Sequence, residues 1–166
     1  MIRVLGSLLI ASSSCWLGER QAQTLHRRRE TLYDLVGSLE QLRRELEFHQ
    51  TPLPELFAWL VQVVPTRIQI LFSVCEYQLR EEGIMTGWSR GTEQILMLTQ
   101  DERQTLSSLG EILGRYPVRE QSEAIGAVCT YLKQCGERAE MEYRRMGKVY
   151  RGLGAACGGI LIILLL

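Results

Sequence analysis

Apolar residues gather at both ends of the chain, and charged residues fill the middle. Residues 1–18 carry one charged side chain, Arg3, and residues 152–166 carry none, so 37 of the 38 charged residues lie between them. At about 1.5 Å per residue, the first segment measures about 27 Å as a helix, close to the thickness of a hydrocarbon core of about 30 Å. Tyr150 and Arg151 extend the shorter second segment. We therefore predict a transmembrane helix at each end.

The middle of the chain repeats its apolar positions every three or four residues, and no segment alternates over the length of a strand. In the first part, leucines seven apart, with others between them, form a stripe typical of a coiled-coil helix. These leucines are Leu25, Leu32, Leu35, Leu39, Leu42 and Leu46. The stripe ends at residues 49–52, where we expect Thr51 to cap the next helix, with Pro52 and Pro54 in its first turn.

Proline and glycine then divide the remaining sequence into further helices. Short helices are expected over residues 53–64, 67–82, 87–98 and 99–117, and a long one from Val118 to the C-terminal end. Thr99 and Glu102 have the spacing of a capping box at the start of one of them. Small residues at positions where helices would approach closely are Gly110, Gly114, Gly136 and Ala139.

The predicted fold class is all-α. Residues 19–151 form a cytoplasmic bundle of about six helices, and the long first and last helices continue into transmembrane segments at residues 1–18 and 152–166. Three alternatives compete for the N-terminal segment: a cleaved signal peptide, a lipoprotein signal that ends at Cys15, and a buried core helix. Ala11 and Ser13 make a weak cleavage site, and Ser12 stands where a lipoprotein signal has a large aliphatic residue.

Positive charge predicts the orientation of the two spans. Basic residues follow the first span and precede the second, which places the middle domain in the cytoplasm and both termini outside. These residues are Arg27, Arg28, Arg29, Arg144, Arg145, Lys148 and Arg151. Arg3 and the terminal amino group oppose this orientation weakly, and Trp16 suits an anchor at the interface.

Small residues four apart occur in both predicted spans, where they let two helices pack closely in lipid or simply reflect the composition of membrane segments. They are Ser7, Ala11, Ser14 and Gly18 in the first span, and Gly154, Ala155, Gly158 and Gly159 in the second. The two spans could pair with each other or with a partner's helix, including that of a second copy.

Composition and motifs point away from catalysis. Lys and Arg equal Asp and Glu at 19 each, so the chain lacks the basic excess that favours nucleic acid. The five cysteines form no C-x-x-C pair, and His26 and His49 lie far from any cluster at metal-ligand spacing. Phosphate-binding and hydrolase motifs are missing. We therefore expect no enzyme activity, no metal and no cofactor.

The order of several motifs resembles the stage III sporulation protein AB family over essentially the whole chain. An Arg-rich helix ends in Thr51-Pro52-Leu53-Pro54-Glu55, Leu109-Gly110-x-x-Leu113-Gly114 is followed by Gln121, and Lys148-x-Tyr150-x-x-Leu153-Gly154-x-x-x-Gly158 precedes an aliphatic tail. One departure is Tyr116-Pro117, where the family pattern has a short polar stretch.

The resemblance implies a membrane component of the channel complex that spore formers build between mother cell and forespore. Its helical domain is expected to resemble the cytoplasmic domain of type II secretion and type IV pilus platform proteins. The implied location is the mother-cell side of the outer forespore membrane. The implied partner is the complex's secretion-type ATPase. Candidate turn or interaction residues are Thr51, Pro52, Pro54, Glu55, Gly110, Gly114 and Gln121.

Three functions remain open from the sequence. The first is a non-enzymatic platform or adaptor in this trans-envelope, secretion-like complex. The second is a small membrane-bound sensor or regulator that signals through its continuous first and last helices. The third is a secreted lipoprotein processed at Cys15.

Overall fold

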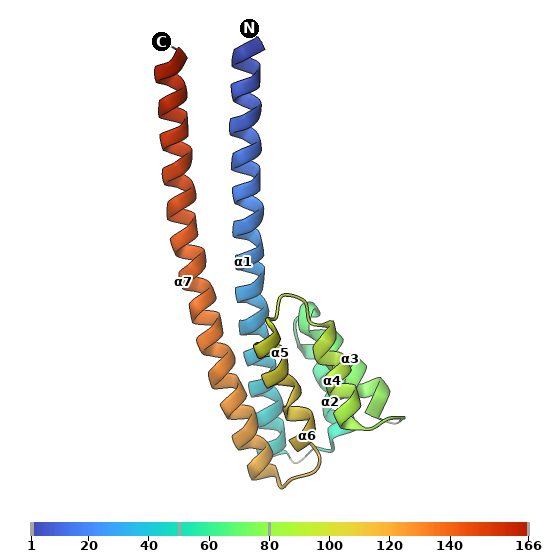
Figure 1. The fold of residues 1–166 in the computed structure, drawn as a ribbon. Coiled ribbons are helices and arrows are strands. Elements are labelled where there is room, and N and C mark those ends of the chain that lie inside the picture. Colours follow the sequence, from blue (N-terminus) through green and yellow to red (C-terminus); the bar gives the residue numbers. More distant parts are fainter. Residues whose placement is uncertain (1, 50, 80, 166) are drawn as a thin grey trace. The chain divides into compact units, whose positions relative to one another are not determined.

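The computed structural model describes the backbone of residues 2–49, 51–79 and 81–165, and the side chains of residues 23–24, 26–49, 51–79 and 81–145. This part of the chain contains seven helices and no strand, which confirms the predicted all-α class (Figure 1). The helices are α1 Ile2–Phe48, α2 Leu53–Val63, α3 Thr66–Leu79, α4 Ile84–Gln94, α5 Gln100–Ser107, α6 Leu109–Ile112 and α7 Val118–Leu165.

The chain divides into two compact units. Unit 1 comprises Met1–Arg29 and Glu137–Leu166, and unit 2 comprises Glu30–Gly136. Helices α1 and α7 contribute to both units, whereas the short helices α2–α6 belong to unit 2. This division does not coincide with the boundaries expected at residues 18 and 152, which stay a prediction.

In unit 2 the two long helices pack antiparallel. The Cys129 thiol lies 4.0 Å from the carbonyl oxygen of Val36, and the Tyr33 ring lies 3.6 Å from the place of a Cβ on Gly136. The leucines from Leu32 to Leu46 in the stripe on α1 are all buried, which confirms that this stripe faces the core. Burial of this apolar face, rather than local helix propensity, supplies most of the stability of such helices.

Three aromatic side chains form the core of the short helices. Phe57 of α2, Phe72 of α3 and Trp88 of α4 are fully buried, with ring centroids 6.1 to 6.2 Å apart. The indole Nε1 of Trp88 donates a hydrogen bond of 2.7 Å to the carbonyl oxygen of Leu106. This bond satisfies the only polar atom of the Trp88 side chain and ties α4 to α5.

Glycine permits close contacts between these helices. A Cβ on Gly91 would stand 2.7 Å from the carbonyl oxygen of Leu71, so α3 and α4 approach as closely as their backbones allow. A Cβ on Gly110 would stand 3.1 Å from Cβ of Trp88, which confirms the expected close approach at that position.

Several expected helix boundaries differ from the structure. Thr51 does not cap α2: the N-cap is Pro52, whose extended backbone starts the helix without a side-chain hydrogen bond. Gly83, at φ +85°, precedes a helix that begins at Ile84 rather than at residue 87. Thr99 and Glu102 do form the predicted capping box, with each side chain bonded to the other residue's backbone N–H.

The helix expected over residues 99–117 is two helices, α5 and α6. The hydroxyl of Ser108 donates a hydrogen bond of 2.8 Å to the carbonyl oxygen of Thr105. Serine side chains often compete in this way with the backbone hydrogen bonds of a helix. Five short helices therefore lie between α1 and α7 in the chain, one more than expected.

Within the described part of the chain, no helix is both long enough and apolar enough to cross a bilayer. The segments predicted to do so, residues 1–18 and 152–166, lie outside the residues whose side chains are described. The same holds for the candidate packing residues Ser7, Ala11, Ser14, Gly18, Gly154, Ala155, Gly158 and Gly159, and for Lys148 and Arg151.

Candidate functional site

Gln121 fastens the turn that joins α6 to α7. Its Oε1 accepts a hydrogen bond of 3.1 Å from the backbone N–H of Gly114, and its Nε2 donates one of 2.5 Å to the carbonyl oxygen of Tyr116. Gly114 has φ +74°, a left-handed conformation that glycine adopts without strain. The buried amide of Gln121 thus holds a tight reversal of the chain in one shape.

The Thr51–Glu55 turn meets this reversal. A Cβ on Gly114 would stand 3.0 Å from Cδ1 of Leu53, so the side chain of Leu53 packs directly on the glycine. Thr51 is half-buried, whereas Pro52, Pro54 and Glu55 are exposed. Two motifs more than fifty residues apart in the sequence therefore form one structural feature.

A polar cluster joins the end of α1 to the start of α7. The Arg43 Nε donates to the hydroxyl of Ser122 at 2.8 Å and to Oε1 of Glu47 at 3.1 Å, and the Ser122 hydroxyl donates to Glu47. The hydrogen bond from Ser122, and next the one from Arg43, lower the pKa of the Glu47 carboxyl. Glu47 is therefore a stable anion at neutral pH.

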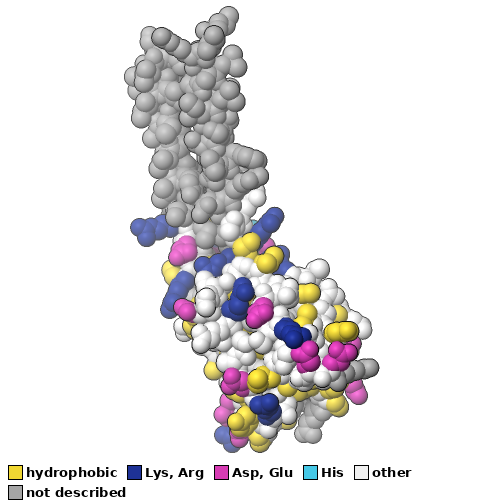
Figure 2. All heavy atoms as spheres, turned by 45° about the vertical axis from the view of Figure 1, so that its right-hand side comes forward, with side chains coloured by type: hydrophobic (Ala, Val, Ile, Leu, Met, Phe, Trp, Pro, Cys, Tyr) yellow, Lys and Arg dark blue, Asp and Glu magenta, His cyan; other side chains and the backbone are white. Residues whose placement is uncertain are grey.

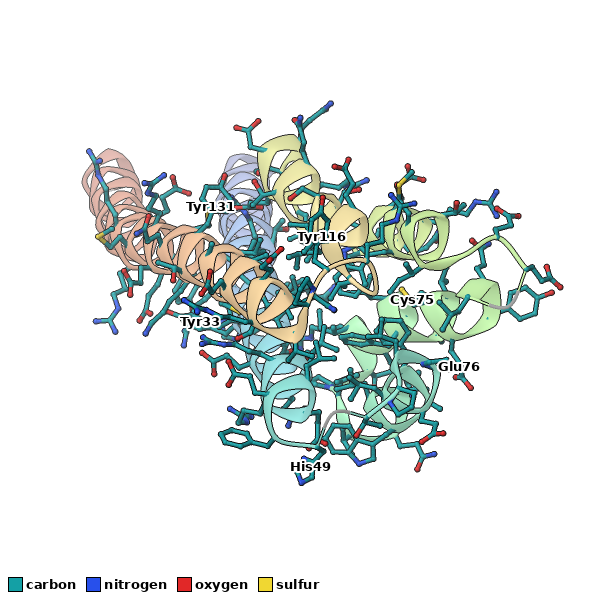
Figure 3. All side chains as sticks on the ribbon, turned by 90° about the horizontal axis from the view of Figure 1, so that it is seen from below. Tyr33, His49, Cys75, Glu76, Tyr116 and Tyr131 are labelled. Atoms are coloured by element: carbon teal, nitrogen blue, oxygen red, sulfur yellow. The ribbon has the colours of Figure 1, made fainter. Side chains whose placement is uncertain are left out.

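These contacts define one surface of unit 2, which we name the turn end. It is formed by the last turn of α1, the start of α2, the turn between α6 and α7, and the start of α7. A shallow hollow there is lined by Arg43, Glu47, Val118, Arg119, Ser122 and Glu123. Phe48, Tyr116 and Val118 are 75%, 52% and 37% exposed around it. Figure 3 views the molecule from below, with Tyr116 and His49 labelled.

The turn end has the chemistry of a binding surface. Exposed aromatic side chains beside paired charges are common at protein interfaces, where the aromatic groups supply most of the binding free energy.

Among the residues that the structure describes, no group of three metal-ligating side chains occurs. The imidazole Nδ1 of His49, one residue beyond the end of α1, lies 3.0 Å from the carboxylate of Glu45, and His26 lies against Tyr143 with ring centroids 5.6 Å apart.

The thiols of Cys75 and Cys129 are buried elsewhere in unit 2, where they contribute to packing and are poorly suited to nucleophilic chemistry. Burial raises the pKa of Cys75 to about 12 and that of Cys129 to about 11. Because the thiolate is the reactive form, both groups are inert at neutral pH. In Figure 3 Cys75 lies among the short helices, whereas the adjacent Glu76 is exposed.

The structure places the predicted interaction residues in two roles. Gly114 and Gln121 build the turn end, as does the Thr51–Glu55 turn, whereas Gly110 is buried against Trp88, where it serves packing. Sequence patterns missed Phe48 and the cluster around Ser122. The spacing of Arg43 and Glu47, four apart on a helix, was the one available signal, and it occurs on many solvated helix surfaces.

Five of the basic residues that predicted the membrane orientation have described side chains, and all five lie in unit 1. Arg29 lies 3.9 Å from the carboxylate of Glu140, which also receives hydrogen bonds of 2.7 and 3.1 Å from Arg144. Arg27 and Arg145 are exposed, and Arg28 is half-buried.

Comparisons with known proteins agree on one family. A solved structure named "Stage III sporulation protein AB (SpoIIIAB)" superposes with a TM-score of 0.64 at 24% identity, covering 71% of this chain and 97% of that chain. No curated protein matches the chain. The sequence model described as "Stage III sporulation protein AB (spore_III_AB)" matches residues 3–166, so the chain belongs to the stage III sporulation protein AB family.

Proposed function

We propose that this chain is a non-enzymatic, membrane-anchored platform or adaptor of the secretion-like channel complex between mother cell and forespore. Its anchor is two transmembrane helices in the outer forespore membrane, and residues 19–151 face the mother-cell cytoplasm. Membership of a sporulation family supports a role in spore formation. The turn end supports a binding role rather than a catalytic one.

The register of the long helices in unit 1 supports the two spans. His26 lies against Tyr143, and Arg29 lies against Glu140, so three residues along α1 correspond to three residues back along α7. Counted along the sequence, Gly18 and Arg151 lie eight residues beyond His26 and Tyr143, respectively. The two predicted span boundaries are therefore equally far along the chain from this contact, which suits two helices that enter the same bilayer face.

The turn end is the proposed contact with a second subunit, for which the secretion-type ATPase of the complex is our candidate. Phe48, Tyr116 and Val118 would supply buried apolar area, and the charged cluster of Arg43 and Glu47 would fix orientation. The turn is held rigid by Gln121, which lowers the entropic cost of binding.

An affinity measurement between the full chain and the ATPase tests this assignment. The double variant Phe48→Ser with Tyr116→Ser should weaken binding at least tenfold, because each exposed aromatic anchor contributes about 1 to 2 kcal/mol. The matched control is Tyr77→Ser with Leu96→Ser, which removes two side chains that are 71% and 74% exposed elsewhere in unit 2. The control should bind within twofold of the unaltered chain. Equal losses for both double variants would contradict the assignment to the turn end.

A further inference from the structure

The two units carry opposite net charge, which the neutral total conceals. Unit 1 contains ten Lys and Arg against four Asp and Glu, a net charge of +6, and unit 2 contains nine against fifteen, a net charge of −6. The excess positive charge therefore belongs to one compact unit rather than to the chain as a whole.

Within unit 1 the positive charge is concentrated further. Residues 26–29 and 143–151 hold seven basic side chains and no acidic one. The contact between His26 and Tyr143 brings these two stretches together on neighbouring helices. We name them the basic collar: Arg27, Arg28, Arg29, Arg144, Arg145, Lys148 and Arg151. Figure 2 shows dark blue Lys and Arg side chains gathered at the upper edge of the described part.

The acidic residues of unit 1 cannot neutralise the collar. Glu140 serves both Arg144 and Arg29, and Arg144 remains 75% exposed in spite of this ion pair. Arg27 and Arg145 are exposed as well. Guanidinium groups match the phosphate oxygens of a phospholipid, which they bind through two parallel N–H···O hydrogen bonds.

The position of the collar selects a membrane surface as its partner. At about 1.5 Å per residue, Lys148 and Arg145 stand about 5 and 9 Å along α7 from Arg151, the last residue before the predicted span. The shorter distance lies within the Debye length of about 8 Å at physiological salt and the longer is comparable with it, so these charges would act on lipid headgroups. This step rests on the proposed membrane anchoring.

We propose that the basic collar binds anionic phospholipid headgroups, of the phosphatidylglycerol class, in preference to zwitterionic ones. Each basic residue near an anionic surface strengthens association about fivefold. The strength with which the collar binds the membrane therefore depends on the local content of anionic lipid. This dependence is additional to anchoring by apolar helices.

Lipid retention by the full chain tests the proposal. The chain is reconstituted in vesicles of phosphatidylglycerol and phosphatidylcholine with identical tails, extracted in mild detergent, and its retained lipids are measured by mass spectrometry. We expect at least fivefold enrichment of phosphatidylglycerol over the vesicle composition, falling as salt rises from 0.05 to 0.5 M. The triple variant Arg27→Gln, Arg144→Gln, Arg145→Gln should retain lipids within twofold of the vesicle ratio.

A second triple variant separates local from total charge. Arg44→Gln, Arg90→Gln, Arg115→Gln removes the same charge from exposed positions of unit 2 and should keep the enrichment. Absence of enrichment in a chain that resists alkaline carbonate extraction would overturn the collar proposal while leaving the anchoring intact. Release of the unaltered chain by carbonate would contradict the anchoring, and this proposal with it.

Discussion

The backbone N–H of Gly114 donates a hydrogen bond of 3.1 Å to the side-chain oxygen of Gln121, seven residues further along the chain. The side-chain Nε2 of Gln121 donates to the carbonyl oxygen of Tyr116, so this one side chain bonds two backbone groups of the turn between α6 and α7. Because Gln121 is 6% exposed, water cannot readily replace these bonds.

Replacing Gln121 therefore destabilises the protein. Gln121→Ala removes two hydrogen bonds that hold the turn between α6 and α7, and should lower the free energy of unfolding by about 1 to 2 kcal/mol. Urea unfolding of the full chain, followed by tryptophan fluorescence, measures this change. The control is Gln62→Ala at an exposed position of α2, which should change stability by less than about 0.5 kcal/mol. A loss for Gln121→Ala no larger than the control's would contradict the role of Gln121 in holding the turn between α6 and α7.

Two glycines should respond to alanine in opposite directions. At Gly91 an added Cβ would lie 2.7 Å from the carbonyl oxygen of Leu71, so Gly91→Ala must push α3 and α4 apart, at a cost of about 1 to 3 kcal/mol. At Gly37, in α1, nothing lies within 4 Å, and Gly37→Ala should stabilise by about 0.5 to 1 kcal/mol through helix propensity. Thermal unfolding compares them, and a shift of the same sign in both variants would be inconsistent with the packing.

The capping box fixes where α5 begins. Thr99→Ala removes the hydroxyl that accepts from the backbone N–H of Glu102, and should cost about 1 kcal/mol. Thr99→Ser keeps this acceptor and should recover most of the loss. Hydrogen exchange at Glu102 and Arg103 reports the effect locally; unchanged exchange in Thr99→Ala would show that the cap contributes nothing.

Burial protects the thiols of unit 2 from alkylation. With a pKa of about 12, Cys75 is almost entirely protonated at pH 8, so iodoacetamide should modify it at least a hundredfold more slowly than a thiol introduced on the surface by Gln62→Cys. Peptide mass spectrometry of the native and urea-unfolded chain gives both rates. Equal rates in the native chain would mean that Cys75 is accessible.

The same thiols make stability depend on alkaline pH. Folding raises the pKa of Cys75 and Cys129 above the unfolded value, so the folded state favours the protonated thiols. Their contribution is fully present below the unfolded pKa of about 8.5 and is lost as pH rises toward 11 to 12. Between pH 9 and pH 10 the unfolding free energy should fall less steeply in Cys75→Ala than in the unaltered chain. Identical slopes would contradict the assigned pKa shift.

Local sequence patterns predicted what local physics determines. The leucine stripe of α1 specifies its buried face, and Thr99 with Glu102 starts α5, because both depend on spacings within one helix. Thr51 was expected to cap α2, yet Pro52 takes the N-cap position, because its fixed φ suits the first residue outside a helix.

Contacts between distant segments could not be predicted in the same way. The bond from Trp88 to Leu106 depends on how α4 packs on α5, and the contact of Leu53 with Gly114 depends on how α2 packs on the turn after α6. The family motifs did locate the turn end, since they include Gly114 and Gln121. They did not include Phe48 or Ser122, whose exposure and pairing follow only from the packed structure.

Heat-resistant spore counts test the central claim, a membrane-anchored subunit needed for spore formation, most directly. In the host, the gene is deleted and replaced either by the full chain or by residues 19–151 alone, each with its protein level confirmed. We predict that spores are lost on deletion and restored only by the full chain. Normal spore counts after deletion, or full rescue by residues 19–151, would contradict the account.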